Sequence, residues 1–239
     1  MAQSGTPVWR SIRDTLASEI AQQGLRPGDR LPTEAQLSAR FGVNRHTLRR
    51  AVASLVDEGL LRARRGSGVF VAMQPVEYAI GRHVSFHQNL ALAGRLPGRR
   101  VNVTARRPAD PVEAQALRIL AGEEVWVSEG VSTADDQPIA LYRTVFPAAR
   151  FPGLDERLSR LSSVTAALNE AGLAEFLRAE TRISAQTVTV AQALLLNAQE
   201  GQPLIVTQSV NTDMQGVPVE YGTTWFLSER VTLITRSEI

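Results

Sequence analysis

Five residues with hydrogen-bonding side chains stand close together at the start of one amphipathic segment: Arg45, His46, Thr47, Arg49 and Arg50. Arginine can donate two hydrogen bonds to the O6 and N7 atoms of guanine, and threonine can contact a phosphate or a thymine methyl group. At helical spacing the apolar residues of this segment fall on the opposite face, so the polar side chains project together. This pattern is typical of a recognition helix, which enters the major groove of double-stranded DNA by its N-terminal end.

Three amphipathic segments form the frame that must position these residues. Apolar residues at four-residue steps predict a first helix over residues 8–23. Thr33, followed three residues later by Gln36, predicts a capping box at the start of a short second helix, which Gly42 ends in a left-handed conformation. Asn44 can cap a third helix, which carries the basic cluster.

Two short strand-like runs, residues 61–64 and 69–71, follow the third helix and predict a β-hairpin. Glycine at its tip would allow the backbone to approach the minor groove or the phosphates closely. Three helices and a hairpin together predict a winged helix-turn-helix, in which the hairpin is the wing. The expected DNA contacts outside the basic cluster are Thr33, Asn44, Arg64, Arg65, Gly66, Ser67 and Gly68.

An ordinary solvated helix face is the alternative explanation for the arginines. The short turn, the second basic cluster at residues 62–65 and the glycine-rich tip favour DNA binding instead. The charge distribution agrees, because residues 1–75 hold eleven arginines against six acidic residues, whereas residues 76–239 hold fifteen against eighteen. An anionic partner is therefore expected for the N-terminal part.

The composition excludes several kinds of chemistry. The chain has 239 residues and no cysteine, which rules out disulfides, thiolate metal sites and thiol nucleophiles. No run of about 18 apolar residues and no basic-then-apolar leader is visible, so we expect neither a membrane span nor secretion and place the protein in the cytoplasm. No serine–histidine–aspartate set and no pair of carboxylates can be assigned to one pocket, so no catalytic residues are expected.

The C-terminal part contains an internal repeat. The segment EAQALRILAGEEVWV, from Glu113, is matched by VAQALLLNAQEGQPLIV, from Val190, and each continues as a strand, a polar turn and a second strand. A strand-like run precedes each helix, at residues 101–106 and 182–188. The repeat predicts two β-α-β-β units that share one mixed sheet with the helices on one face. A linker is expected at residues 73–80, where periodicity is weak.

The phrase LPTEAQLSARFGVNRHTLRRAVASLVDEGLLRARRGSGVFV resembles the DNA-binding domain of the GntR family of bacterial transcription regulators over about 70 residues. The resemblance implies that Arg45, Thr47 and Arg49 contact DNA from the recognition helix and that residues 66–68 form the wing tip. Many members carry an arginine after the glutamate of the second helix, and this sequence has Ala35 there. One expected contact is therefore missing.

The phrases VSFHQNLALAGRLPGRR, YRTVFPAARFPGL and PVEYG resemble the UTRA effector domain of the HutC subfamily, whose fold is similar to that of chorismate lyase. The wording is most similar to regulators of phosphonate or phosphate metabolism. The resemblance implies an α+β chain: a winged helix-turn-helix at residues 1–72, a linker at 73–80, and at 81–239 a UTRA domain with a mixed, mostly antiparallel sheet. Such domains bind small, often anionic metabolites between the two halves of the sheet.

Hydroxyl and guanidinium donors suit the oxygens of an anionic ligand. Some relatives that bind sugar phosphates use arginines on the strand that reads SEGVSTAD in this chain; Gly130 and Ser132 stand near those positions and argue against a sugar phosphate. Ordinary surface positions or strand pairing remain the alternative for each candidate. The candidate ligand residues are Ser85, Asn89, Arg143, Arg150, Ser163, Glu220 and Tyr221.

His83 and His87 are four residues apart and could face one another on a helix as metal ligands. A tetrahedral metal site needs further ligands, and the sequence contains no cysteine and no HExxH pattern. We therefore expect no metal and no cofactor.

A ligand-responsive transcription regulator is the leading hypothesis, expected to bind a palindromic operator as a homodimer and to act as a repressor. The first alternative is an enzyme, in which a lyase-like domain is fused to DNA-binding helices. The second is an architectural DNA-binding protein, whose C-terminal domain would have no ligand pocket.

Overall fold

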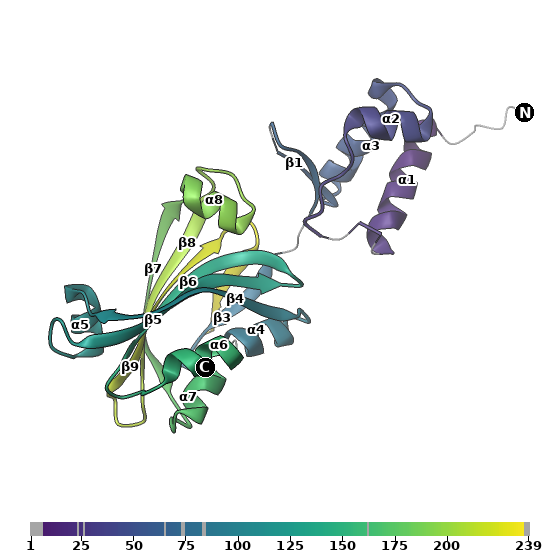
Figure 1. The fold of residues 1–239 in the computed structure, drawn as a ribbon. Helices are drawn as coiled ribbons and strands as arrows, with labels where there is room; N and C mark the ends of the chain where they lie inside the picture. The colour runs from purple at the N-terminus through teal and green to yellow at the C-terminus, as the bar shows by residue number, and fades with distance from the viewer. Residues whose placement is uncertain are drawn as a thin grey trace, which may run out of the picture. The chain divides into compact units, whose positions relative to one another are not determined.

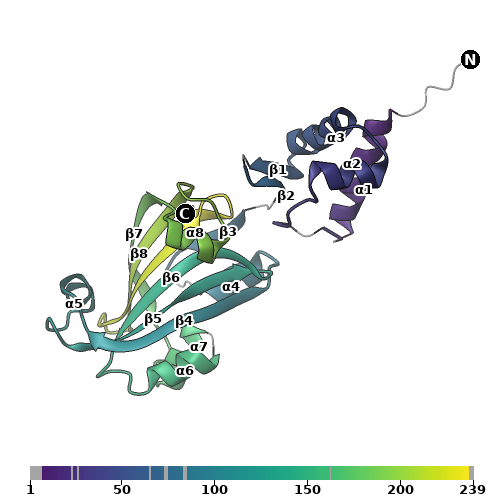
Figure 2. The same cartoon turned by 45° about the horizontal axis from the view of Figure 1, so that its top comes forward.

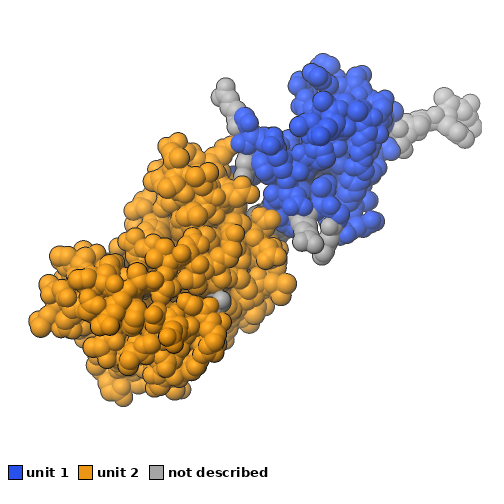
Figure 3. All heavy atoms as spheres, in the orientation of Figure 1, with its two compact units in different colours: residues 1–74 blue, residues 75–239 orange. Residues whose placement is uncertain are grey.

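The computed structural model describes residues 7–22, 24–25, 27–64, 66–72, 75–82, 85–161 and 163–236. The chain forms two compact units, residues 1–74 and residues 75–239 (Figure 3). None of the helices in the described ranges has the length and apolar composition needed to cross a membrane.

The first unit contains three helices and a hairpin, as predicted (Figure 1). Its core is made of leucines and other small apolar residues that all three helices and both strands contribute, such as Leu16, Leu37, Leu48, Leu55 and Val71. The elements are α1 (Val8–Ala21), α2 (Glu34–Phe41), α3 (Arg45–Asp57), β1 (Leu61–Arg64) and β2 (Gly68–Val71).

The predicted helix caps of this unit are confirmed. The Thr33 hydroxyl accepts a hydrogen bond from the Gln36 backbone while the Gln36 side chain bonds back to the Thr33 backbone. Gly42 ends α2 with a φ of 65°, and Asn44 Oδ1 accepts a hydrogen bond of 2.9 Å from the Thr47 amide. These caps fix where α3 begins, and so which residues occupy its first turn.

The second unit is built on a six-stranded sheet in the order β4-β5-β6-β9-β8-β7, and every neighbouring pair in it is antiparallel. The two predicted β-α-β-β units are present: β4-α5-β5-β6 and β7-α8-β8-β9. They meet at the central β6–β9 pair. The elements are β4 (Pro97–Pro108), α5 (Pro111–Leu117), β5 (Glu124–Ala134), β6 (Gln137–Pro147), β7 (Leu177–Thr187), α8 (Val190–Leu196), β8 (Pro203–Thr212) and β9 (Pro218–Leu227).

The linker expected at residues 73–80 is wrong in its second part. Val76–Ile80 forms strand β3, which pairs in parallel with β10 (Val231–Thr235), and Val76 is buried. Along β3, inward-packed residues alternate with exposed ones. Five residues of this alternation are too short a pattern to predict a strand from the sequence. Residues 73 and 74 lie outside the described residues.

Helices cover both faces of the sheet, whereas the repeat predicted helices on one face only. The repeat helices α5 and α8 pack on one face, beside Val127 and Val206 respectively. The other face, which we call the inner face, carries α4 (Phe86–Leu92), α6 (Leu154–Leu161), α7 (Val164–Glu170) and the β3–β10 pair. Figure 2 shows α8 and the α6–α7 pair on opposite sides of the sheet. The additional helices come from segments outside the repeat, so the repeat could not predict them.

Candidate functional sites

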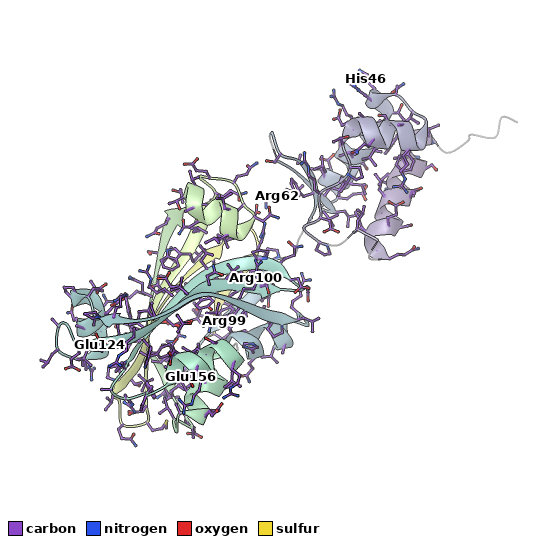
Figure 4. All side chains as sticks on the ribbon, in the orientation of Figure 1. His46, Arg62, Arg99, Arg100, Glu124 and Glu156 are labelled. Atoms are coloured by element: carbon purple, nitrogen blue, oxygen red, sulfur yellow. The ribbon has the colours of Figure 1, made fainter. Side chains whose placement is uncertain are left out.

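The exposed face of α3 carries the basic cluster. Arg45, His46, Arg49 and Arg50 are exposed, and the buried residues of the helix lie on its other side. His46 lies near the N-terminal end of α3 and projects from the unit (Figure 4). The structure therefore brings these four side chains to one surface, as expected of a recognition helix.

Each polar side chain of α3 has a different local environment. The Arg50 guanidinium lies 4.6 Å from the centre of the Trp9 ring, and the Thr47 hydroxyl donates a 3.0 Å hydrogen bond to Asn44 Oδ1. Arg49 forms an ion pair with Glu34, the first residue of α2. Because Asn44 and Thr33 use their side-chain oxygens as helix caps, they are positioned at helix starts more firmly than free surface residues.

The wing tip has the backbone geometry that glycine permits. Gly66 and Gly68 have φ values of 76° and 109°, and Ser67 lies between them. A Cβ atom at position 68 would lie 3.0 Å from Nε of Arg30, a residue that the sequence did not single out. Arg65 and the side chain of Arg64 lie outside the described residues.

A small cavity of about 80 Å³ lies on the inner face of the second unit. Residues from the sheet form its floor, and β3, α4 and the N-terminal end of α7 form its other walls. Its polar lining is Tyr78, Ser85, His87, Arg99, Ser132, Tyr142, Thr144, Ser163, Thr165, Arg178, Ser209, Asn211, Glu220 and Thr224.

Three of the seven candidate ligand residues line this cavity: Ser85, Ser163 and Glu220. Ser163 is also the N-cap of α7 and accepts a hydrogen bond of 3.3 Å from the Ala166 amide. The buried side chain of Asn89 instead holds β3 to α4, since its Oδ1 atom accepts a 2.9 Å hydrogen bond from the Ala79 amide.

The other three candidates lie elsewhere. Arg143 pairs with Glu129, and Arg150 pairs with Asp213. Tyr221 lines a more open groove of about 450 Å³ between α5 and the β7–β8 strands, and its hydroxyl accepts a hydrogen bond from Gln208. Neighbouring residues of a strand point to opposite faces of the sheet, so Glu220 and Tyr221 cannot both line one cavity.

Arg99 is a cavity residue that sequence reasoning missed. Its guanidinium lies 3.6 Å from the centre of the Tyr142 ring, and its buried Nε has no hydrogen-bond partner among the described residues. Burial lowers the pKa of Arg99, and the nearby Tyr142 and Glu220 partly oppose the shift. Figure 4 shows Arg99 on the interior side of β4, between the sheet and its inner-face helices. The site thus contains a buried cation whose hydrogen-bonding capacity is largely unused.

Arg178 is the second cation of the cavity and is held by protein groups. Its Nε donates a 2.6 Å hydrogen bond to Asn211 Oδ1, and Asn211 Nδ2 donates a 2.7 Å hydrogen bond to Glu220 Oε2. Glu220 is 7% exposed, and burial raises the pKa of its carboxyl, while Arg178, Asn211 and Arg99 oppose that shift. This chain of hydrogen bonds fixes the Arg178 guanidinium in one orientation.

The two arginines occupy equivalent places in the internal repeat. Arg99 on β4 lies opposite Ser132 on β5, and Arg178 on β7 lies opposite Asn211 on β8. In the aligned repeats VSEGVS and VTQSVN, Ser132 and Asn211 coincide. The hydroxyl of serine is too short to hold its arginine as asparagine does, so only one of the two guanidiniums is tied to the sheet.

Gly130 stands where an arginine would be expected in some relatives, and the structure gives it a packing role. A Cβ atom there would lie 2.0 Å from the Arg100 carbonyl oxygen and 2.7 Å from the Tyr142 hydroxyl. The close approach of β4 and Tyr142 therefore requires glycine. β5 has no arginine at this position, and the arginine that lines the cavity here is Arg99 of β4.

One signal in the sequence could have located the cavity. Polar residues occupy same-face positions of strands that lie in the middle of a sheet, as in Ser209 and Asn211 on β8 and in Glu220 and Thr224 on β9. A polar residue at a position that faces a buried sheet surface indicates a lined cavity.

The described residues contain no group of three histidine, aspartate or glutamate side chains that could hold a metal ion. His87 lines the cavity, and burial lowers its pKa, which keeps the imidazole neutral beside Arg99. His83 lies outside the described residues.

Comparisons with known proteins match both units. The model of the family described as bacterial regulatory proteins, gntR family, matches residues 9–71, and the UTRA domain model matches residues 92–232. An uncharacterized HTH-type transcriptional regulator of Rhizobium meliloti is 36% identical over 97% of this chain and 95% of the relative. The HTH-type transcriptional repressor PhnF of Mycolicibacterium smegmatis is 30% identical over 87% of this chain and 84% of the relative. A crystal structure of PhnF from Mycobacterium smegmatis has a TM-score of 0.65 and 26% identity, covering 95% of this chain and 99% of that chain.

Proposed function

Because this chain belongs to the GntR family of bacterial regulatory proteins and carries a UTRA domain, it is a DNA-binding transcription regulator, and we propose that it is a repressor controlled by a small anion. The anion would bind in the cavity on the inner face of the second unit. The unpaired guanidinium of Arg99 is the observation that carries this proposal. A desolvated guanidinium whose Nε makes no hydrogen bond is costly, and a bound oxyanion would supply the missing acceptor.

The cavity favours a very small ligand. A cavity of about 80 Å³ has room for several water molecules, since about 10–15 Å³ on this kind of measure holds one. Inorganic phosphate or a short alkyl phosphonate suits that volume better than a complete sugar phosphate. The similarity of this chain to the repressor PhnF agrees with a ligand related to phosphate or phosphonate.

The proposed ligand contacts combine cations with hydroxyls. Arg99 and Arg178 would balance the negative charge, and Ser85 and Ser163 would donate hydrogen bonds to the anion. Glu220 has a raised pKa, so a protonated carboxyl could also donate a hydrogen bond to an anionic oxygen.

We infer that the protein binds DNA as a homodimer on a palindromic operator. One helix and one wing bury too little surface for specific binding alone, and two-fold symmetric half-sites are the usual solution in helix-turn-helix proteins. The proposed DNA contacts are those of α3 and the wing. Since DNA is its partner, the protein is proposed to act in the bacterial cytoplasm.

A sensor is favoured over an enzyme because, among the described residues, no hydrogen bond joins a hydroxyl of the cavity lining to His87 or Glu220. Incubation of the protein with a captured metabolite separates the two hypotheses. A regulator returns the metabolite unchanged, whereas a lyase-like enzyme converts it.

Native mass spectrometry of freshly purified protein is the direct test of the proposal. A retained anion of low mass, displaced by added inorganic phosphate or methylphosphonate, would support the cavity as its site. DNA binding that responds to neither probe, in protein that contains no captured metabolite, would argue against an anion sensor.

A further inference from the structure

Arg49 and Glu34 form an ion pair on the DNA-facing surface of the first unit. Nε of Arg49 lies 2.9 and 3.0 Å from the two carboxylate oxygens of Glu34, and Nη2 lies 2.9 Å from Oε2. The pair links the second turn of α3 to the first residue of α2. Both side chains are well exposed, at 61% and 46%, so the pair contributes little to stability and its role must be sought at the surface.

The carboxylate engages only one side of the guanidinium. Arginine offers five N–H donors in a rigid planar fork, and Glu34 occupies the side formed by Nε and Nη2. The end of the fork, formed by Nη1 and the remaining N–H of Nη2, is left for another acceptor. Two parallel donors at that end match the O6 and N7 atoms of guanine.

The negative charge of Glu34 also opposes the main competitor for Arg49, which is a DNA phosphate. A phosphate would be repelled by the adjacent carboxylate, whereas the edge of a neutral base would not. Arg45 stabilises the charge of Glu34 from a distance, and together with the hydrogen bond from Arg49 it lowers the pKa of this carboxyl. Glu34 therefore stays ionised in the range where the protein works.

The residue after Glu34 increases this effect. Ala35 has no charge, so no arginine next to Glu34 in the chain competes with Arg49 for the carboxylate. By contrast, neither Arg45 nor His46 makes a hydrogen bond to any described residue. Arg49 alone among the basic residues of α3 is held by a carboxylate.

We propose that Glu34 is a positioning residue for sequence recognition: it holds Arg49 end-on toward the major groove and directs its guanidinium to a base and away from the phosphates. This inference rests on the proposed entry of α3 into the major groove. It assigns specificity to a residue of α2 that need not touch DNA.

The test compares the base preferences of four full-length proteins: wild type, Glu34→Gln, Arg49→Ala and Glu19→Gln. Each is used to select binding sites from a random duplex library, and the base frequencies are compared position by position. Glu19 forms a partly exposed ion pair with Arg40 that joins α1 to α2, so Glu19→Gln removes a carboxylate charge away from α3. Circular dichroism verifies that each variant is folded.

Arg49→Ala is expected to lose discrimination at one base pair in each half-site, by roughly 5- to 150-fold. Glu34→Gln should lose most of the preference at that same base pair and bind random DNA more tightly. Its salt dependence should also steepen by about one unit in log K against log salt concentration, because one more arginine is free to contact a phosphate. Glu19→Gln should keep the wild-type preferences.

Two results would overturn the inference in distinguishable ways. If Arg49→Ala loses preference at a base pair where Glu34→Gln keeps it fully, Arg49 reads a base without help from Glu34. If Arg49→Ala binds all sequences more weakly and loses preference at none, Arg49 is a phosphate contact, and the proposed placement of α3 fails together with the role of Glu34.

Discussion

The chemistry of the proposed effector cavity is concentrated in a few side chains with unequal surroundings. Arg178 is anchored through Asn211 to Glu220, whereas Arg99 rests only on the ring of Tyr142. A guanidinium that the protein already holds by hydrogen bonds attracts an anion by its charge and need not move. A guanidinium without hydrogen bonds gains more binding free energy when an anion supplies an acceptor. A substitution of Arg99 should therefore weaken binding of the anion without destabilising the fold.

Arg99→Met is expected to abolish the rise in melting temperature that inorganic phosphate or methylphosphonate produces in the wild-type protein. The unliganded variant should be at least as stable as the wild type, because methionine fills the space without a buried charge. Differential scanning fluorimetry over a range of ligand concentrations measures both effects. Arg100→Met is the matched control, since Arg100 is exposed and lies on the opposite side of β4 (Figure 4). Equal losses in the two variants would contradict a specific role for Arg99.

Glu220 gives the protein a pH-dependent stability of predictable sign. Its folded-state pKa is raised above the ordinary 4.5, so its contribution to the free energy of unfolding is fully present below pH 4.5 and is lost as pH rises through the folded pKa. Glu220→Gln should remove this loss. Denaturant titrations of both proteins between about pH 5 and 8 provide the measurement.

Other titratable groups around Glu220 do not change the direction in which the unfolding free energies of wild type and Glu220→Gln diverge with pH. Arg99, Arg178, Tyr78 and His87 face the same cavity in both proteins, so their own titration enters both stability curves. A difference in unfolding free energy between wild type and variant that is constant with pH would contradict a raised pKa for Glu220.

At the scale of elements, caps and repeats could be predicted because their causes are local. The sequence around Thr33, Gln36 and Asn44 contains the whole of each cap, and a duplicated segment repeats its own pattern. The exposed position of the basic residues of α3 followed directly from the caps and the apolar pattern. Strand β3 could not be predicted, since it is stabilised by β10, more than 150 residues away in the chain.

Which residues of β4 face the cavity could not be predicted, because this depends on the pairing of β4 with β5. We expected the first strand of the repeat to begin at residue 101, but β4 begins at Pro97 and contains a bulge between Val101 and Val103. A bulge reverses the alternation of side chains along the strand. Whether Arg99 or Arg100 faces inward therefore depends on the register with β5, which only the folded sheet defines.

Arg230 connects elements that lie far apart in the chain. It is 4% exposed, and its guanidinium donates hydrogen bonds to the carbonyl oxygens of Pro138, Leu196 and Asn197. The last two carbonyls belong to the C-terminal end of α8, where helical partners are missing. One side chain thus joins the end of α8 to the start of β6.

Arg230→Met is expected to lower the free energy of unfolding of the second unit by about 3 kcal/mol or more, because several buried carbonyls lose a charged donor together. Urea denaturation followed by tryptophan fluorescence measures the loss. The exposed Arg236 offers the control Arg236→Met, which should leave the midpoint unchanged. Equal midpoints for wild type and Arg230→Met would show that water replaces these hydrogen bonds at no cost.

At the scale of the whole molecule, the proposed effector cavity includes a residue that is close in the chain to the DNA-binding unit. Tyr78, a residue of the cavity wall, belongs to β3, which begins directly after the segment that leaves the first unit. A ligand that shifts Tyr78 therefore acts on the strand that anchors this connection. Contacts of this kind can bias a conformational equilibrium without a long pathway.

Ligand and DNA should therefore influence one another by the same factor. If methylphosphonate weakens operator binding by some amount within about 5- to 150-fold, operator DNA must weaken methylphosphonate binding equally. Fluorescence anisotropy of labelled DNA and calorimetric titration of the ligand measure the two factors. A large effect in one direction and none in the other is thermodynamically inconsistent with one coupled equilibrium and would show that the two assays do not report the same binding events.

The paired arginines of the internal repeat differ in one partner residue. The two copies of the repeat place a cation at corresponding points of β4 and β7, but only the β8 copy has an asparagine to hold its arginine. The substitution Ser132→Asn would make the two halves alike and offer Arg99 the hydrogen-bond acceptor that Arg178 already has. An Arg99 held in this way should bind the proposed anion more weakly, while the fold stays intact.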